Sequence, residues 1–307
     1  MRKIIPARFL HLFLILPALL LITSATAAYA DNSEMQHKYD ELKTALQNNV
    51  YGIPVFIQSS DTDQVTQGEV YGVITHSFNS VKNALTTPET WCDIAPLHLN
   101  IKACTYQNID SKHIITFYAG RKFYEKADDV YQLSYHFKLN QIEDDYVHVS
   151  LFAKDGSMGT SDYRISTEAI PLDDSRTFVH FKYSYHYNFL TSIGMSTYLA
   201  TIGRDKVGFS VTGKDENDDP VYIGGVKGII ERNTIRYYFA IESYLDTLQV
   251  DPEKRFDARL NKWFDLTEKY PRQLHEMDRK DYLQYKEHEH LDQARLQQQL
   301  SGQKNAD

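Results

Sequence analysis

The fold is decided by residues 220–248, PVYIGGVKGIIERNTIRYYFAIESYLDTL. This stretch predicts a short glycine-bearing strand and then a helix that runs to about Leu248. Asn233 or Thr234 is the predicted N-cap, because either side-chain oxygen can accept from the free amides of the first turn. Two apolar stripes follow at helical spacing: Ile235, Tyr238, Phe239 and Leu245 form one, and Tyr237, Ile241, Tyr244 and Leu248 form the other. A helix that is apolar on most sides needs several partners, and a curved sheet wrapped around it supplies them.

Charged and small residues interrupt this stretch at defined places. Arg236 and Glu242 break the apolar surface, and two interpretations stay open for each: a polar group pointing into a cavity, or a solvated edge or local ion pair. Gly224, Gly225 and Gly228 lack the G-x-G-x-x-G spacing and the strand-loop-helix order of a phosphate loop. They predict bulges or close packing against the helix.

Upstream, the chain is mostly strand. Short polar turns separate most of the predicted strands, which are residues 50–58, 69–78, 98–106, 113–121, 130–139, 146–154, 161–170 and 176–187. Strands joined directly by short turns are antiparallel neighbours. Alternation in two of them puts one set of aromatic side chains on one face: Tyr135, Phe137, Phe181, Tyr183 and Tyr185. That face is predicted to be core, and the opposite face, which carries His180 and Ser184, is predicted to be wet.

Helices are predicted around this sheet. Residues 33–46 form a short amphipathic helix, and residues 79–96 form one or two short helices, the second starting at Pro88. Residues 188–203 predict an apolar helix, either a lid or membrane-touching surface or a helix packed on the sheet edge. Residues 251–307 predict helices whose end, beyond Asp278, projects or frays.

The N-terminus has the features of an export signal. Basic residues precede an apolar run from Phe9 to Ile22, and small residues end at Ala30. This pattern predicts a signal peptide at residues 1–30, cleaved after Ala30, and hence an exported, periplasmic protein with no further membrane span. A permanent anchor is disfavoured because the run is shorter than the roughly 20 residues that a span needs.

The two cysteines, Cys92 and Cys104, predict a disulfide in an oxidising compartment; two separately buried thiols are the alternative. The sequence contains no recognisable catalytic motif and implies no cofactor. His288, Glu289 and His290 lack a third metal ligand at a familiar spacing, so a solvated charge run is predicted there. The formal net charge of -8 disfavours a nucleic-acid partner.

The order of these elements resembles the START-like superfamily, whose helix-grip fold wraps a curved antiparallel sheet around a long C-terminal helix. The blocks WCDIAPLHLNIKAC at 91–104 and RNTIRYYFAIESYL at 232–245 resemble a family of exported bacterial proteins of unknown function. The predicted fold is therefore α+β, with a signal peptide at 1–30, an N-terminal helix and strand at 31–65, a START-like domain at 66–250 and a charged helical extension at 251–307.

The resemblance implies a cavity between the sheet and the long helix that holds a lipid, sterol or aromatic ligand. The candidate lining residues are Tyr135, Phe137, Phe181, Tyr183, Tyr185, Arg236, Phe239 and Glu242. A carrier of such a hydrophobic molecule is the first hypothesis, since such sites are apolar with a few polar groups. The alternatives are an enzyme of the cyclase or hydrolase type, and a non-catalytic envelope protein that binds a protein partner through its C-terminal helices.

Overall fold

The computed structural model describes residues 32–188, 191 and 206–303. The predicted signal peptide at 1–30 lies outside the described residues, and so does nearly all of the predicted helix at 188–203. The described residues belong to one compact unit. Among them, no helix is both long and apolar enough to cross a membrane.

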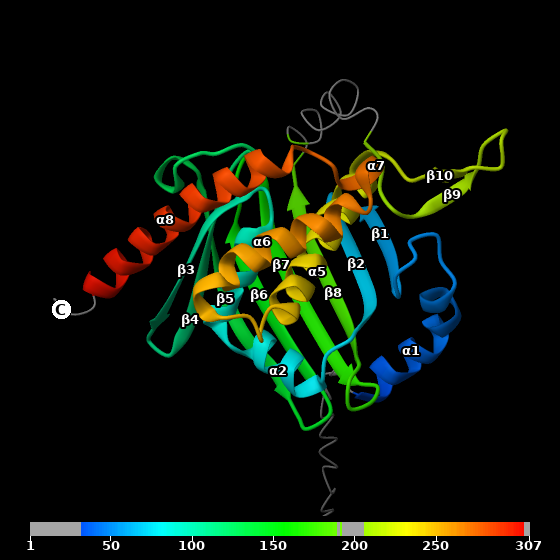
Figure 1. Cartoon of the computed structure of the whole chain (residues 1–307), viewed down its shortest axis with the longest axis horizontal. Helices are drawn as coiled ribbons and strands as arrows, with labels where there is room; N and C mark the ends of the chain where they lie inside the picture. The colour runs from blue at the N-terminus through cyan, green and yellow to red at the C-terminus, as the bar shows by residue number, and fades with distance from the viewer. Residues whose placement is uncertain (1–31, 189–190, 192–205, 304–307) are drawn as a thin grey trace, which may run out of the picture. The chain divides into compact units, whose positions relative to one another are not determined.

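The core of the fold is an eight-stranded antiparallel sheet (Figure 1). Its strands are β1 (Val55–Thr62), β2 (Val65–Ile74), β3 (Ile101–Ile109), β4 (Lys112–Ala119), β5 (Tyr131–Ile142), β6 (Val147–Asp155), β7 (Thr160–Pro171) and β8 (Thr177–Tyr187). Their order across the sheet is β1-β2-β8-β7-β6-β5-β4-β3. The predicted meander is confirmed, and β1 and β3 form the two edges.

Helices cover both faces of this sheet. They are α1 (Asn32–Gln47), α2 (Phe78–Thr86), α3 (Pro88–Ile94), α5 (Gly225–Asp246), α6 (Pro252–Glu268), α7 (Pro271–Leu274) and α8 (Arg279–Gln303). Short 3-10 turns are η1 (Ala95–Leu97) and η2 (Ala127–Asp129), and a separate hairpin pairs β9 (Val211–Lys214) with β10 (Pro220–Tyr222). Figure 1 shows α5 and α6 lying across the sheet. The chain therefore has the predicted α+β, helix-grip architecture.

The helix α5 begins earlier than the sequence predicts. Its N-cap is Gly224, so the prediction of a cap at Asn233 or Thr234 is wrong. Thr234 lies in the middle of the helix, where its hydroxyl donates to the carbonyl of Ile230 one turn back (2.7 Å). Gly225 has a positive φ of 64°, which starts the helix from a conformation that suits glycine.

Two glycines on β2 let α5 come close to the sheet. A Cβ at Gly68 would lie 2.3 Å from the Thr234 hydroxyl, and one at Gly72 would lie 2.1 Å from the Tyr238 hydroxyl. Both distances are far below van der Waals contact, so only glycine fits at these positions. The helix is held against β1, β2 and β8 rather than against the middle of the sheet.

The face opposite α5 is partly covered as well. Met35, Leu42 and Leu46 of α1 pack with Tyr71 and Phe178 of the sheet in a second apolar cluster. His180 and Ser184, predicted to be wet, are buried at this face, so that part of the prediction is wrong. At His180 the reason is that its ring stacks on Tyr71 (4.1 Å between centres) and contacts the carboxylates of Glu69 and Glu168.

The first hairpin is also tighter than predicted. Its strands β1 and β2 pair from Thr62 with Val65, and only Asp63 and Gln64 form the turn. Both turn residues have positive φ, as in the two-residue turns whose twist matches a hairpin. The polar residues that predict a long turn belong instead to the strands, because β1 is an edge strand with an exposed side.

The last helix neither projects nor frays over its described residues. The α8 helix lies along the edge strand β3 (Figure 1). Gln293 and Gln297 accept hydrogen bonds from the backbone amides of Cys104 (2.8 Å) and Tyr106 (2.9 Å), and Gln297 also donates to the carbonyl of Tyr106 (3.0 Å). The glutamine amides thus take the place of a neighbouring strand.

The predicted disulfide is confirmed. Cys92 at the end of α3 is joined to Cys104 in β3, with Cα atoms 4.9 Å apart. The bond ties the short helices to the edge strand that α8 covers. Disulfides persist in oxidising compartments, which agrees with export from the cytoplasm.

Candidate ligand-binding site

Five tyrosines gather between the sheet and α5, and we call them the tyrosine cluster. They are Tyr135 of β5, Tyr163 of β7, Tyr183 and Tyr185 of β8, and Tyr237 of α5. The ring centres lie 5.1 Å apart for Tyr163 and Tyr185, 5.8 Å for Tyr183 and Tyr185, and 5.6 Å for Tyr183 and Tyr237. Strand alternation directs the four sheet tyrosines to one face, which is the face that α5 covers.

The hydroxyl groups of this cluster are uncharged, and most of them make no hydrogen bond to the described residues. Burial raises the pKa of Tyr135 and Tyr183 well above its ordinary value, and neighbouring tyrosines raise it further. Tyr163 shares a hydrogen bond with the Thr160 hydroxyl (2.8 Å). The hydroxyls of the other four cluster members make no hydrogen bond within the described part of the chain. Each can therefore donate to, and accept from, a guest molecule.

His98 adjoins the cluster. It lies between η1 and β3, and its ring stacks on Tyr237 with 4.6 Å between centres. Its Nδ1 accepts from the backbone amide of Asn100 (3.1 Å), so in the neutral ring the proton lies on Nε2. That Nε2 is buried and has no hydrogen-bond partner among residues 32–188, 191 and 206–303. Burial, followed by the charges of Arg236 and Lys286, holds the pKa of His98 well below 6.5, so the ring is a neutral donor.

The C-terminal helix fixes the segment that carries His98. Lys286 of α8 donates to the carbonyls of His98 (2.9 Å) and Ile101 (3.0 Å), and it also pairs with Glu289 (2.7 Å). Glu289 pairs in turn with Lys102 (2.8 Å). All three charged side chains are buried. Burial lowers the pKa of Lys286 to about 8 although Glu289 opposes the shift. Glu289 is thus part of a buried ion pair network, and the predicted solvated charge run is wrong at this residue.

The structure brings together five of the predicted lining residues. Tyr135, Tyr183 and Tyr185 belong to the tyrosine cluster, and Phe181 lies 6.0 Å from Tyr237 between ring centres. Phe137 is buried in the same core. These aromatic residues form an apolar wall with hydroxyl groups set in it, a composition typical of small-molecule sites.

The other three predicted lining residues lie elsewhere. Phe239 stacks on Tyr270, with 5.9 Å between ring centres. Arg236 faces the C-terminal extension, where its guanidinium donates to the carbonyl of Leu274 (3.2 Å) and pairs with Glu276 (2.9 Å). Of the two interpretations for Arg236, the local ion pair is therefore the one that the structure contains.

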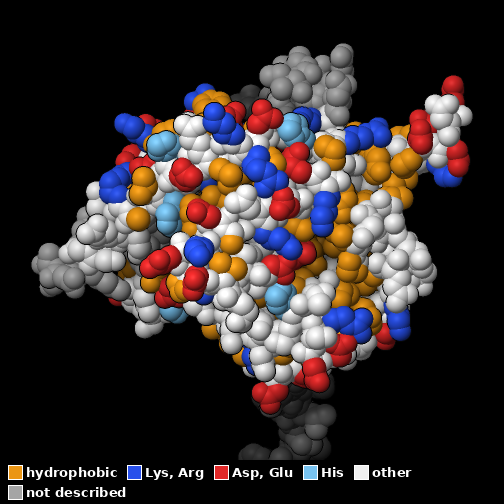
Figure 2. Space-filling model, viewed as in Figure 1, with side chains coloured by type: hydrophobic (Ala, Val, Ile, Leu, Met, Phe, Trp, Pro, Cys, Tyr) orange, Lys and Arg blue, Asp and Glu red, His pale blue; other side chains and the backbone are white. Residues whose placement is uncertain are grey.

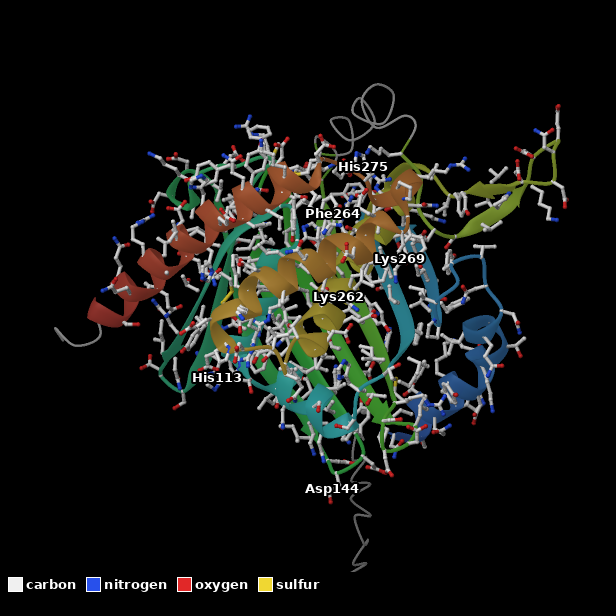
Figure 3. All side chains as sticks on the ribbon, in the orientation of Figure 1. His113, Asp144, Lys262, Phe264, Lys269 and His275 are labelled. Carbon is white, nitrogen blue, oxygen red and sulfur yellow. A yellow bond between two sulfur atoms is a disulfide. The ribbon has the colours of Figure 1, made fainter. Side chains whose placement is uncertain are left out.

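Glu242 lies in a separate pocket of about 200 Å³, beside β1 and β2. The pocket is lined by Ile53, Pro54, Val55, Val73, Thr75, Tyr238, Glu242 and Asp246. Apolar side chains gather on the visible face in this region (Figure 2). Burial and the nearby Asp246 raise the pKa of Glu242. Asp246 itself is neutralised by Lys262 of α6 (2.6 Å), which Figure 3 labels.

Three members of the site were not among the predicted lining residues. Tyr163 alternates with the other inward residues of its strand, and Tyr237 lies on a predicted apolar stripe, so both carried a periodic signal. His98 belongs to no periodic pattern of the sequence, because it precedes a strand and its position depends on contacts with α8. In the described part of the chain, no group of His, Cys, Asp or Glu side chains is arranged to hold a metal ion.

These features define an α+β protein of helix-grip architecture with an aromatic interior. The sequence matches no protein-family model and no curated protein. Among solved structures, the chain is similar to a STAR-related lipid transfer protein from Xanthomonas axonopodis (11% identity, 65% of this chain and 96% of that chain, TM-score 0.39). It is also similar to a conserved protein from Geobacillus kaustophilus (10% identity, 59% and 95%, TM-score 0.35).

A third similar structure is the Zhui aromatase/cyclase from Streptomyces sp. R1128 (10% identity, 65% of this chain and 94% of that chain, TM-score 0.33). Because all three TM-scores are low, the fold assignment rests on the strand order and on the position of α5.

Proposed function

We propose that this protein binds a hydrophobic small molecule between the sheet and α5, at the tyrosine cluster and His98, and that it is an exported carrier. The observation that carries the proposal is the buried Nε2 of His98, which has no partner in the described part of the chain. A buried donor without an acceptor costs about 1–3 kcal/mol, so a ligand oxygen that accepts from it recovers that free energy.

The tyrosine cluster supports the same proposal. Its rings offer apolar surface, and four of its hydroxyls lack partners in the described residues. The disulfide supports the exported location, because such bonds persist outside the reducing cytoplasm. The ligand that fits this chemistry has an apolar or aromatic body and at least one hydrogen-bond acceptor.

An enzyme acting on such a ligand is the second candidate. The contact between His98 and Tyr237 brings together two residue types that transfer protons. The low pKa of His98 makes its ring a weak base, which favours a hydrogen-bond donor over a general base. A protein partner for the C-terminal helices gains no support from the geometry, because α8 uses its glutamines on β3.

The test is a titration with Nile red, with monoolein as a neutral competitor. The His98→Asn variant keeps an acceptor in the position of Nδ1 but removes the Nε2 donor. The His98→Gln variant keeps a donor in the position of Nε2. We expect the dissociation constant of monoolein to rise roughly tenfold for His98→Asn and to change little for His98→Gln.

Unfolding curves of both variants serve as the control for stability. Equal monoolein affinity in the parent protein and both variants would remove His98 from the site. Absence of binding by the parent protein would contradict the proposed function itself.

A further inference from the structure

The pocket that contains Glu242 lies apart from the tyrosine cluster, at the C-terminal end of α5 beside β1 and β2. Its volume of about 200 Å³ equals that of about six or seven molecules of liquid water. Aliphatic side chains from the start of β1 and from β2 form its walls, among them Val55 and Val73. The pocket is therefore large enough for a small organic molecule with an apolar body.

Glu242 is half-buried in this pocket, and its carboxylate makes no hydrogen bond and no ion pair within the part of the chain that the structure describes. Asp246, one turn further along α5, differs, because it lies 2.6 Å from both Lys262 and His76. Lys269, which Figure 3 labels at the end of α6, affects Glu242 only from a distance. The pKa of Glu242 is raised by burial and then by Asp246, and the neighbouring basic side chains do not cancel the shift. The carboxylate is therefore partly withdrawn from water without a donor to replace it.

Two hydroxyl groups accompany this carboxylate. Burial, followed by the charge of Glu242, raises the pKa of Tyr238, so the Tyr238 hydroxyl lies near the carboxylate. Thr75, which follows β2, also lines the pocket. Neither hydroxyl makes a hydrogen bond to the described residues. The pocket thus combines aliphatic walls with one carboxylate and two hydroxyl oxygens that can accept hydrogen bonds.

We infer that this pocket is a second binding site, for a small amine that carries a primary ammonium group on an apolar body. An ammonium group has three donors and no acceptor, which matches the three acceptors of the pocket. It pairs with the Glu242 carboxylate, whereas an anion is repelled by Glu242 and an uncharged molecule leaves that charge uncompensated. The apolar body packs against Val55 and Val73. This site shares no residue with the tyrosine cluster, so the inference does not depend on the proposed function.

The experiment measures dissociation constants of the mature chain at pH 7 for two probes with the same body, the cation of 2-phenylethylamine and the uncharged 2-phenylethanol. We expect the amine to bind roughly tenfold more tightly than the alcohol, with an affinity that falls as salt rises. Glu242→Gln keeps the shape of the side chain but removes its charge, and it should weaken the amine roughly tenfold and leave the alcohol unchanged. Glu287→Gln, at an exposed position of α8, is the matched control and should change neither affinity.

Two further measurements locate the bound amine. Its addition should shift the backbone amide resonances of Ile53, Val55 and Val73, and His98→Asn should leave its affinity unchanged. Unfolding curves check the fold of Glu242→Gln, which should be at least as stable as the parent protein, because the variant removes a charge that has no partner. Equal affinity of the parent protein and Glu242→Gln for the amine, or no binding of the amine by the parent protein, would overturn the inference and leave the proposed function intact.

Discussion

At the scale of single residues, α5 lies close to the sheet because two positions of β2 are glycines, which have no side chain. Gly72 leaves room for the hydroxyl of Tyr238, and Gly68 leaves room for Thr234. We expect Gly72→Ala to lower the free energy of unfolding by roughly 1–3 kcal/mol, because the added methyl group forces the helix away from β2. Urea unfolding followed by circular dichroism measures the change.

A paired variant and a control sharpen this test. Gly72→Ala combined with Tyr238→Phe removes the clashing hydroxyl and should recover part of the loss. Gly213→Ala in β9 is the matched control, because no heavy atom among the described residues lies within 4 Å of the added Cβ. A Gly72→Ala variant as stable as Gly213→Ala would show that the helix is not held this closely.

Glu276 makes stability depend on pH in the acid range. Burial raises its pKa, but the charges of Arg236, Lys122 and Lys206 outweigh burial and hold the pKa at about 2. The ionised Glu276 carboxylate therefore stabilises the folded state fully above about pH 4.5, its pKa in the unfolded chain. This stabilisation is lost as the pH falls from there through 2. The shift corresponds to roughly 3 kcal/mol, and Glu69, whose pKa is also about 2, acts in the same window.

We expect Glu276→Gln to be less stable than the parent protein at pH 7 and to lose less stability between pH 5 and pH 2. Glu216→Gln, at an exposed position of the β9–β10 hairpin, is the control and should follow the parent curve. Parallel curves for Glu276→Gln and the parent protein would mean that Glu276 is not held by these cations. The measurement is chemical unfolding at each pH.

At the scale of elements, the α8 helix explains how an edge strand is kept from pairing with other chains. Its glutamines occupy the backbone groups of β3 that an incoming strand would use. We expect the double variant Gln293→Ala and Gln297→Ala to lose about 2–4 kcal/mol, since each of its hydrogen bonds contributes about 1 kcal/mol. The amides of Cys104 and Tyr106 should then exchange faster in hydrogen exchange.

The control for this variant is Gln298→Ala, on the exposed side of the same helix. It should leave both amides protected. Unchanged exchange at Cys104 and Tyr106 in the double variant would show that α8 does not cap the strand. A shift of the double variant towards dimers on size exclusion would add support, because an uncovered edge strand pairs readily.

The position of α8 could not be predicted from the sequence. Apolar periodicity predicts the meander, the short helices 79–96 and the burial of α5, because each depends on packing of apolar faces. The α8 helix has few apolar residues, and its binding to β3 depends on glutamine amides and on the buried network of Lys102, Lys286 and Glu289. Such contacts have no period along the chain, so the sequence alone predicts a projecting or frayed end.

At the scale of the whole molecule, the candidate site is assembled from distant parts of the chain. The sheet and α5 supply the tyrosine cluster, and alternation predicted three of its five members: Tyr135, Tyr183 and Tyr185. The segment at His98 is placed by Lys286 of α8. The position of His98 could not be predicted, because Lys286, which holds it, is 188 residues away and the two share no pattern along the chain.

The most direct test of the central claim is native mass spectrometry of the mature chain, purified from an exporting host, followed by organic extraction. The account predicts one bound hydrophobic molecule per chain, released by extraction and retained less in His98→Asn than in His98→Gln. A mass equal to the bare polypeptide, together with no uptake of Nile red or monoolein, would contradict it.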